Sequence, residues 1–425
     1  MDTSEQTAPI PRLEDIFGPT RLPIPLLPLE DEIFSSWFVR VAHANGLRCN
    51  HLARVLVGRG RPLFHGDIDR GIWKAPVYRL AELVGTTKDV AEKTLLSAYC
   101  PFLWSNVSLR GVWPFVLPIS TQDRKQRKYG FQYCPSCLLS DTTPFYRRYW
   151  RLAFAVVCDV HGIKLKDRCP HCDAPIAIQR ADIKSRFLHK TPSLRHCSSC
   201  HQSLCDISAV EKIDGVLLSS QRLILTTLDR GWINLNGRVI YSHLFFHGLR
   251  MLMSFLDDPK CSGRLQFRLD SLDIAKLESN QSKARRYGGF EQNDAKRRFE
   301  LARATAWIFQ QWPDQFFDEL LLHRFSSTSI LKFNGRSDSA VPYWLWDPVW
   351  EHLNRTMYVP TTIEIHNAAM YLFGQNSNPS IRLLCHLLNL STNHSARVAK
   401  IWHEFKSNLG FTQLKESEVA SPDHT

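Results

Sequence analysis

The sequence predicts a mainly α-helical protein in which a cysteine-rich module lies between two helical regions. Apolar residues recur at helical spacing before residue 120 and again after residue 211. Four closely spaced pairs of Cys or His occupy the segment between them. With 425 residues, 44% of them hydrophobic, the chain is long enough for more than one domain. We therefore expect an N-terminal region over 1–120, a central module over 121–210 and a C-terminal region over 211–425.

The N-terminal region is predicted to begin with two helices. The four-residue spacing of Ile33 and Trp37 belongs to a broad apolar helical face, which ends at the C-cap Gly46. Asn50 is the predicted cap of a second helix, which stops at Gly58.

A helix-turn-helix-like pair is predicted over 77–99. Gly85 marks its turn, and Thr86 and Asp89 have capping-box spacing before the second helix. Such pairs are common as simple packing in α bundles, and some of them bind DNA. Both roles stay open for this pair.

The C-terminal region shows helical spacing over 217–231, 243–256 and 297–325, with a break expected at Pro313. A polar, basic loop over 279–298 separates the last two segments.

Residues 380–405 form a second predicted helix-turn-helix, whose second helix starts near Asn393. Along that helix, Ser395, Arg397, Lys400 and His403 supply polar groups, and Arg397 and Lys400 are the candidate contacts to DNA. The alternative is a terminal helical pair with a solvated face.

Charge is concentrated in the cysteine-rich segment. The chain carries a net charge of +12, and residues 121–200 hold fifteen Lys and Arg against six Asp, a net +9. This balance indicates a polyanionic partner or serves solubility. The N-terminus has no basic start followed by an apolar stretch, and no run reaches 18 apolar residues, so we expect a cytoplasmic protein with no membrane partner.

Paired cysteines in a reducing compartment predict metal binding rather than disulfides. Each pair has a two-residue spacer, which brings two ligand atoms close enough for one zinc ion. We expect two zinc ions, held by eight ligands in all: Cys134, Cys137, Cys158, His161, Cys169, Cys172, Cys197 and Cys200.

Sequential pairing of these knuckles needs the least topology, and an interleaved arrangement stays open. The possible substitute ligands at the second site are Cys205, His171, His196 and His201. The remaining cysteines, Cys205 included, are read as packing: Cys49, Cys100, Cys205, Cys261 and Cys385. Four protein ligands leave no open coordination position, so both sites are predicted to be structural. No motif of a known catalytic site is present, so the chain is predicted not to be an enzyme.

The stretch FYRRYWRLAF lies inside this module. Its arginines, Arg147, Arg148 and Arg151, are candidate nucleic-acid contacts, and they could equally pair with acidic residues of a neighbouring part of the chain. Its aromatic residues are expected to be core: Tyr149, Trp150 and Phe154.

These motifs resemble the TniQ/TnsD family of transposition target-selection proteins. The block from Cys134 to Cys172 is similar to the family pattern C-P-x-C…Y-x-R-x-x-W…C-x-x-H…C-P-x-C over its whole length. PLEDEIFSSWFVRVAHANG resembles the helix with which family members open, and IFQQWPDQFFDELL resembles a W-P-x-x-F segment of their C-terminal half. The resemblance covers residues 28 to about 320 and does not extend over 325–425.

The resemblance implies a non-catalytic adaptor that recognises an insertion site on DNA. It would recruit an AAA+ ATPase regulator and, through the ATPase, the transposase. Some family members read DNA themselves, and others ride on a CRISPR RNA-guided complex, often as a homodimer. The alternative is therefore a passenger of such a guide complex with little DNA affinity of its own. A zinc-dependent nucleic-acid enzyme and a zinc-ribbon transcription regulator are the competing hypotheses from other classes.

Overall fold

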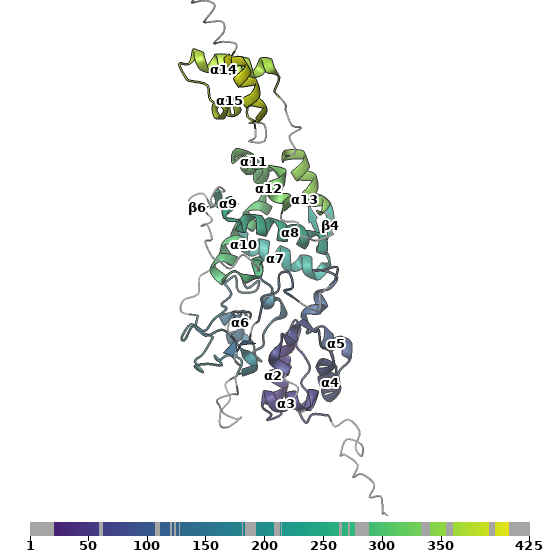
Figure 1. Cartoon of the computed structure of the whole chain (residues 1–425). Helices are drawn as coiled ribbons and strands as arrows, with labels where there is room; N and C mark the ends of the chain where they lie inside the picture. The colour runs from purple at the N-terminus through teal and green to yellow at the C-terminus, as the bar shows by residue number, and fades with distance from the viewer. Residues whose placement is uncertain are drawn as a thin grey trace, which may run out of the picture. The chain divides into compact units, whose positions relative to one another are not determined.

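The structure is a computed structural model of the chain, and it confirms the mainly α-helical prediction (Figure 1). It describes residues 21–58, 63–106, 111–119, 121–122, 125–126, 128–180, 182, 193–207, 213, 215–262, 266–270, 273–276, 289–332, 341–353, 360–390 and 396–407. The contacts divide the chain into two compact units, Met1–Leu353 and Asn354–Thr425. The predicted boundaries near residues 120 and 210 fall inside the first unit and stay a prediction.

Four α-helices and three short 3₁₀ turns are found among the described residues between 21 and 100. They are α2 (Phe34–Ala44), α3 (Cys49–Val57), η1 (Leu63–His65), η2 (Ile68–Arg70), α4 (Ala75–Val84), α5 (Lys88–Glu92) and η3 (Leu96–Tyr99). Helix α2 is the central element, because Phe34, Trp37 and Phe38 are all fully buried. A helix that is buried on most of its surface needs neighbours on several sides, and α3, η2 and η5 pack against it.

The caps of two helices differ from the prediction. Helix α3 begins at Cys49, so Asn50 lies inside the helix and is not its cap. The carboxylate of Asp182, far along the chain, accepts the Cys49 N–H at 2.6 Å. In α5 the capping side chain is Thr87 rather than Thr86. The contact at the start of α3 comes from a distant part of the chain, so a local sequence pattern could not identify it.

The central segment has little regular structure in its described residues. It contains β1 (Thr121–Gln122), β2 (Lys125–Gln126), α6 (Pro135–Ser140), η4 (Arg148–Arg151) and η5 (Ile178–Arg180). Isolated antiparallel bridges join Glu32 to Arg147 and Val116 to Leu152. They tie the middle of this segment to the N-terminal helices. The predicted aromatic core is confirmed, since three rings are at most 8% exposed: Tyr149, Trp150 and Phe154.

The rest of the first unit is a helical assembly around α7, α8 and α10, which pack against one another (Figure 1). Its elements are α7 (Gly215–Arg230), β3 (Trp232–Leu235), β4 (Arg238–Tyr241), α8 (Ser242–Asp257), α9 (Pro259–Ser262), β5 (Gln266–Asp270), β6 (Asp273–Lys276), η8 (Phe290–Gln292), α10 (Ala295–Gln310), α11 (Asp314–Leu322), α12 (Ser327–Leu331), α13 (Tyr343–Pro348) and the π-helical turn η10 (Val349–Leu353). The predicted break at Pro313 is confirmed, because it separates α10 from α11.

The sequence analysis missed the β3–β4 hairpin. Its turn is Asn236–Gly237, with φ of 50° and 80°, and these left-handed values are the ones that an Asn-Gly hairpin turn requires.

The second unit is a small helical cluster with its own core. It contains α14 (Thr362–Gly374), α15 (Ile381–Leu387) and a helix over 396–407. The core residues come from all three helices: Ile365, Ala368, Ala369, Leu384, Val398, Ile401 and Trp402. A reciprocal capping box between Thr361 and Glu364 starts α14.

Candidate metal centres

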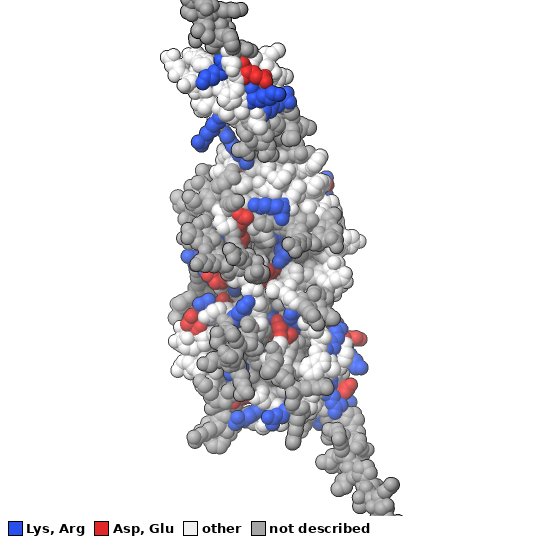
Figure 2. Space-filling model, in the orientation of Figure 1, with Lys and Arg blue, Asp and Glu red and all other residues white. Residues whose placement is uncertain are grey.

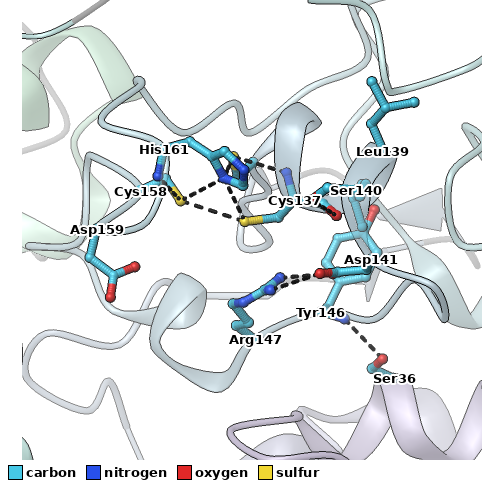
Figure 3. Close-up of polar contacts among 12 residues, drawn as sticks. Ser36, Cys137, Leu139, Ser140, Asp141, Tyr146, Arg147, Cys158, Asp159 and His161 are labelled. Carbon is cyan, nitrogen blue, oxygen red and sulfur yellow. Dashed lines mark hydrogen bonds and ion pairs between the residues drawn. The ribbon is translucent and has the colours of Figure 1, made fainter.

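The first candidate metal centre is formed by Cys134, Cys137, Cys158 and His161 (Figure 3). The Cys137 sulfur lies 3.5 Å from the Cys158 sulfur and 3.2 Å from Nδ1 of His161. Nδ1 also lies 3.6 Å from the Cys134 sulfur and 3.7 Å from the Cys158 sulfur. Four ligand atoms at these separations surround one point, as a tetrahedral metal site requires.

Local backbone geometry places each half of this centre. Cys134 is the N-cap of α6, and its sulfur accepts the Cys137 N–H at 3.4 Å. Pro135 follows at the first helical position, where its missing N–H costs nothing. In the other half, the Cys158 sulfur accepts the His161 N–H at 3.4 Å. The two-residue spacers therefore fold each pair into a compact turn before any tertiary contact is made.

Short strand-like bridges bring the two halves together. Tyr133, just before the first half, pairs with Lys166, and Val157, just before the second, pairs with Lys164. The Tyr133–Lys166 pair exchanges both backbone hydrogen bonds at 2.9 Å. The two halves are thus aligned by the backbone that flanks them.

The second candidate centre is formed by Cys169, Cys172, Cys197 and Cys200. Its sulfurs approach to 3.6 Å between Cys169 and Cys200 and to 3.7 Å between Cys172 and Cys197. Both clusters therefore join knuckles that follow one another in the sequence.

The two knuckles of the second centre have the same backbone design. Cys169 N–H donates to the carbonyl of Ala174, and Cys197 N–H donates to the carbonyl of Gln202, each at 2.9 Å. Each turn closes through a residue with positive φ four positions after its first cysteine, Asp173 and His201. Repetition of one turn at two places is typical of a paired metal knuckle.

The proposed substitute ligands stay outside both clusters in the described part of the chain. His171, for example, contacts the carbonyl oxygen of Ser203 at 3.0 Å.

Each cluster could hold a metal ion such as zinc. A donor set of three thiols and one imidazole, or of four thiols, suits a structural Zn²⁺ site. Without a metal, burial raises the pKa of Cys169 to about 12, so its thiol keeps the proton at neutral pH. A bound cation must displace such protons, which makes metal affinity fall as pH falls.

The candidate arginines near these clusters are held by acidic side chains. Arg147 makes two parallel bonds of 3.1 Å to Asp141, close to the first cluster (Figure 3). Arg148 lies 3.4 Å from Asp31 and stacks over the ring of Tyr99. The two side chains are each 16% exposed. Their contact with nucleic acid stays a prediction.

Arg151 is more deeply placed, with a side chain only 1% exposed. Its guanidinium lies 2.6 Å from Asp67 and 2.9 Å from Asp69, and it also donates to the carbonyl of Leu117 at 3.0 Å. This is the alternative that the sequence allowed, in which an arginine pairs with acidic residues elsewhere. Burial leaves Arg151 no surface that a phosphate could reach, so we leave it out of the proposed interface.

Comparison with known families gives one match. Residues 23–165 match the model of the TniQ family. This segment of the chain is a TniQ domain. No curated protein matches the chain.

The TniQ match spans α2 to α5 and all four residues of the first cluster. It therefore covers the segment in which Arg148 and Arg151 join the central module to acidic residues of the N-terminal region. The family is one of transposition target selection, and this segment fits that role. The second cluster and the C-terminal unit lie beyond the matched residues.

The C-terminal unit of the chain carries the remaining predicted site residues. Arg397 and Lys400 are exposed on the helix over 396–407, while Val398 and Ile401 are buried in the core. The predicted helix start at Asn393, and Ser395 after it, lie outside the described residues. Figure 2 shows basic side chains at the surface of this unit.

In the part of the chain that the structure describes, no helix is both long enough and apolar enough to cross a membrane.

Proposed function

We propose that this TniQ protein is a non-catalytic adaptor that recognises an insertion site on DNA and recruits an AAA+ ATPase regulator, which brings the transposase. The observation that carries the proposal is a separate helical unit with an exposed basic helix face, added to a TniQ segment. The TniQ segment supplies the link to transposition. The added unit supplies a surface of the kind that enters a DNA groove.

We further propose that the two cysteine clusters each hold one structural zinc ion. The ligands are the eight residues named for the two centres, and the support is their donor type and spacing. Where the structure describes the central segment, few regular elements stabilise it. Metal binding would therefore contribute directly to its folding free energy.

The DNA contact is assigned to the helix over 396–407. Its buried side, with Val398 and Ile401, packs on the unit's core, so the opposite side is free to meet DNA. Arg397 and Lys400 are three residues apart and therefore lie on one side of the helix. Between 360 and 407 the chain has four basic and two acidic residues, which favours a polyanionic partner.

The second candidate is a passenger of a CRISPR RNA-guided complex with little DNA affinity of its own. The internal pairing of Arg147 and Arg148 favours it to a degree, because it reduces the basic surface of the first unit. The two candidates differ in where target specificity originates. A change on the C-terminal helix affects target choice only if that helix reads DNA.

The test is to map insertions genome-wide with wild type and with Arg397→Ala plus Lys400→Ala. Loss of one good base contact costs about 1–3 kcal/mol of site preference, roughly a 5- to 150-fold change. Lys406→Ala is the matched control, because Lys406 is exposed on the same helix but points about 180° away from Arg397.

Direct reading predicts scattered or lost insertions for the double variant and an unchanged map for the control. Binding of the ATPase and the zinc content should be unchanged in both. An unchanged map for the double variant would contradict direct reading and would point to a guide complex as the source of specificity.

A further inference from the structure

A third group of potential metal ligands lies at the turn between α2 and α3. It comprises His43 in the last turn of α2, Cys49 at the first position of α3, and Asp182 after η5. Their ligand atoms all lie within 4.8 Å of one another. The sequence analysis assigned Cys49 to packing. Asp182 lies 133 residues later in the chain, so no short spacing links the two.

The distances resemble those of the first cysteine cluster. Nε2 of His43 lies 3.9 Å from the Cys49 sulfur and 3.8 Å from Oδ2 of Asp182. In the first cluster the corresponding separations are 3.2 to 3.7 Å. Zinc bonds of about 2.0–2.3 Å hold tetrahedral ligands roughly 3.3–3.8 Å apart. Both separations from His43 lie within about 0.1 Å of the upper end of this range, and the thiol and carboxylate ligand atoms lie within 4.8 Å of each other.

The contacts of this group bring its three side chains to face one another. Oδ2 of Asp182 accepts the first N–H of α3 and faces His43, which accounts for a carboxylate at this place. The Cys49 sulfur is directed at the same imidazole nitrogen as the carboxylate. Thiol, imidazole and carboxylate thus converge on one point from three separate segments.

The three side chains differ in their exposure to solvent. Cys49 and Asp182 are 1% and 3% exposed, whereas the His43 side chain is 21% exposed. A cation bound among them would have three protein ligands, and the exposed edge of His43 is the side from which a water would complete its coordination. That is the coordination of an open zinc site.

We propose that His43, Cys49 and Asp182 bind a third divalent metal ion, zinc by the chemistry of its sulfur, nitrogen and oxygen donors. On binding, the metal replaces the thiol proton of Cys49, which is released to solvent, and the imidazole binds through its unprotonated Nε2. The bound ion would tie the α2–α3 turn to the segment that follows η5. This site is independent of the proposed role in DNA recognition.

The test counts metal in the full-length protein. Wild type is dialysed against a buffered excess of free zinc and assayed by mass spectrometry of the metal. We expect about three zinc ions per chain in wild type and about two in Cys49→Ala and in His43→Gln. Cys100→Ser is the matched control, since it removes a thiol of the same unit outside all three groups and should keep about three ions.

Cobalt provides a second readout. Co²⁺ added to protein that holds two zinc ions should produce a thiolate-to-cobalt absorption band in wild type and in Cys100→Ser, but none in Cys49→Ala. His43→Gln carries the test if Cys49→Ala does not fold, because His43 is partly exposed and its replacement disturbs the core least.

Two ions in wild type, or an unchanged count in the variants, would overturn the third site. The first of these results would leave the two cysteine clusters intact, so the two proposals can fail separately.

Discussion

Replacing Arg151 by Met should destabilise the first unit by about 3–5 kcal/mol. The guanidinium is 1% exposed and lies within 2.9 Å of two carboxylates, of which Asp69 is itself 1% exposed and Asp67 is 10% exposed. Removing the cation takes the buried counter-charge from Asp69, which keeps only two hydrogen bonds from Ser35. Breaking a buried ion pair in this way costs about 3–5 kcal/mol. Met fills most of the volume, so the loss reports on charge rather than on a cavity.

The assay is thermal unfolding of zinc-saturated protein, followed by circular dichroism. A loss of this size lowers the unfolding midpoint by roughly 5–10 °C in a unit of this length. Arg238→Met is the control, because the Arg238–Asp347 pair is 64% and 50% exposed. Surface pairs contribute about 0–1 kcal/mol, so its midpoint should stay close to that of wild type.

The pH dependence of the loss has a defined sign. Burial raises the pKa of Asp69 to about 7, although Arg151 opposes the rise. An unfolded Asp titrates near 3.9, so this carboxyl lowers the stability of the fold as pH rises from about 4 to about 7. At pH 5 the Asp69 carboxyl of the folded protein is mostly protonated and neutral, so losing the Arg151 cation costs less stability there. The deficit of Arg151→Met should therefore be larger at pH 8 than at pH 5.

A second change separates charge from packing. Adding Asp69→Asn to Arg151→Met removes the more deeply buried of the two negative charges and should recover on the order of 1–3 kcal/mol. The reasoning is refuted if Arg151→Met unfolds within about 1 kcal/mol of wild type at pH 8. Normal stability with weakened DNA binding would instead assign Arg151 to the DNA surface.

Three further predictions concern metal, packing and salt. Cys137→Ser and Cys172→Ser should each remove about one zinc ion and lower the unfolding midpoint, because structural zinc contributes folding free energy. Metal analysis measures the zinc content, and an unchanged zinc count would contradict the prediction. Gly248→Ala should lower the free energy of unfolding by about 1–3 kcal/mol, because a Cβ there would overlap the ring of Trp344. Denaturant unfolding measures this loss, and an unchanged free energy of unfolding would show that α8 and α13 can move apart without cost. The affinity for duplex DNA should fall as the salt concentration rises, and Lys400→Ala should reduce the steepness of log affinity against log salt by roughly 0.9, because the variant neutralises one phosphate fewer. An affinity that does not depend on salt would favour the passenger role.

The sequence alone determined the features that depend on short spacing. A two-residue spacer folds a knuckle from within, as the sulfur of Cys134 shows by accepting the Cys137 N–H. Helical periodicity located α7, α8 and α10, because apolar residues recur at every third or fourth position of an amphipathic helix. Pro313 ended a helix through its own ring and missing N–H. The β3–β4 hairpin had an equally local signal in Asn236–Gly237, but the helical periodicity on both sides obscured it.

Only the tertiary structure decided what the polar groups do. Arg151 is bonded to Asp69, 82 residues earlier, and no pattern in the sequence links the two. The cap of α3 and the group around Cys49 depend on Asp182, 133 residues later. Such pairings form because folding removes water from both partners, and an unpaired charge then becomes costly. Spacing along the chain carries no information about which partner will be near when that happens, because burial is a property of the packed structure.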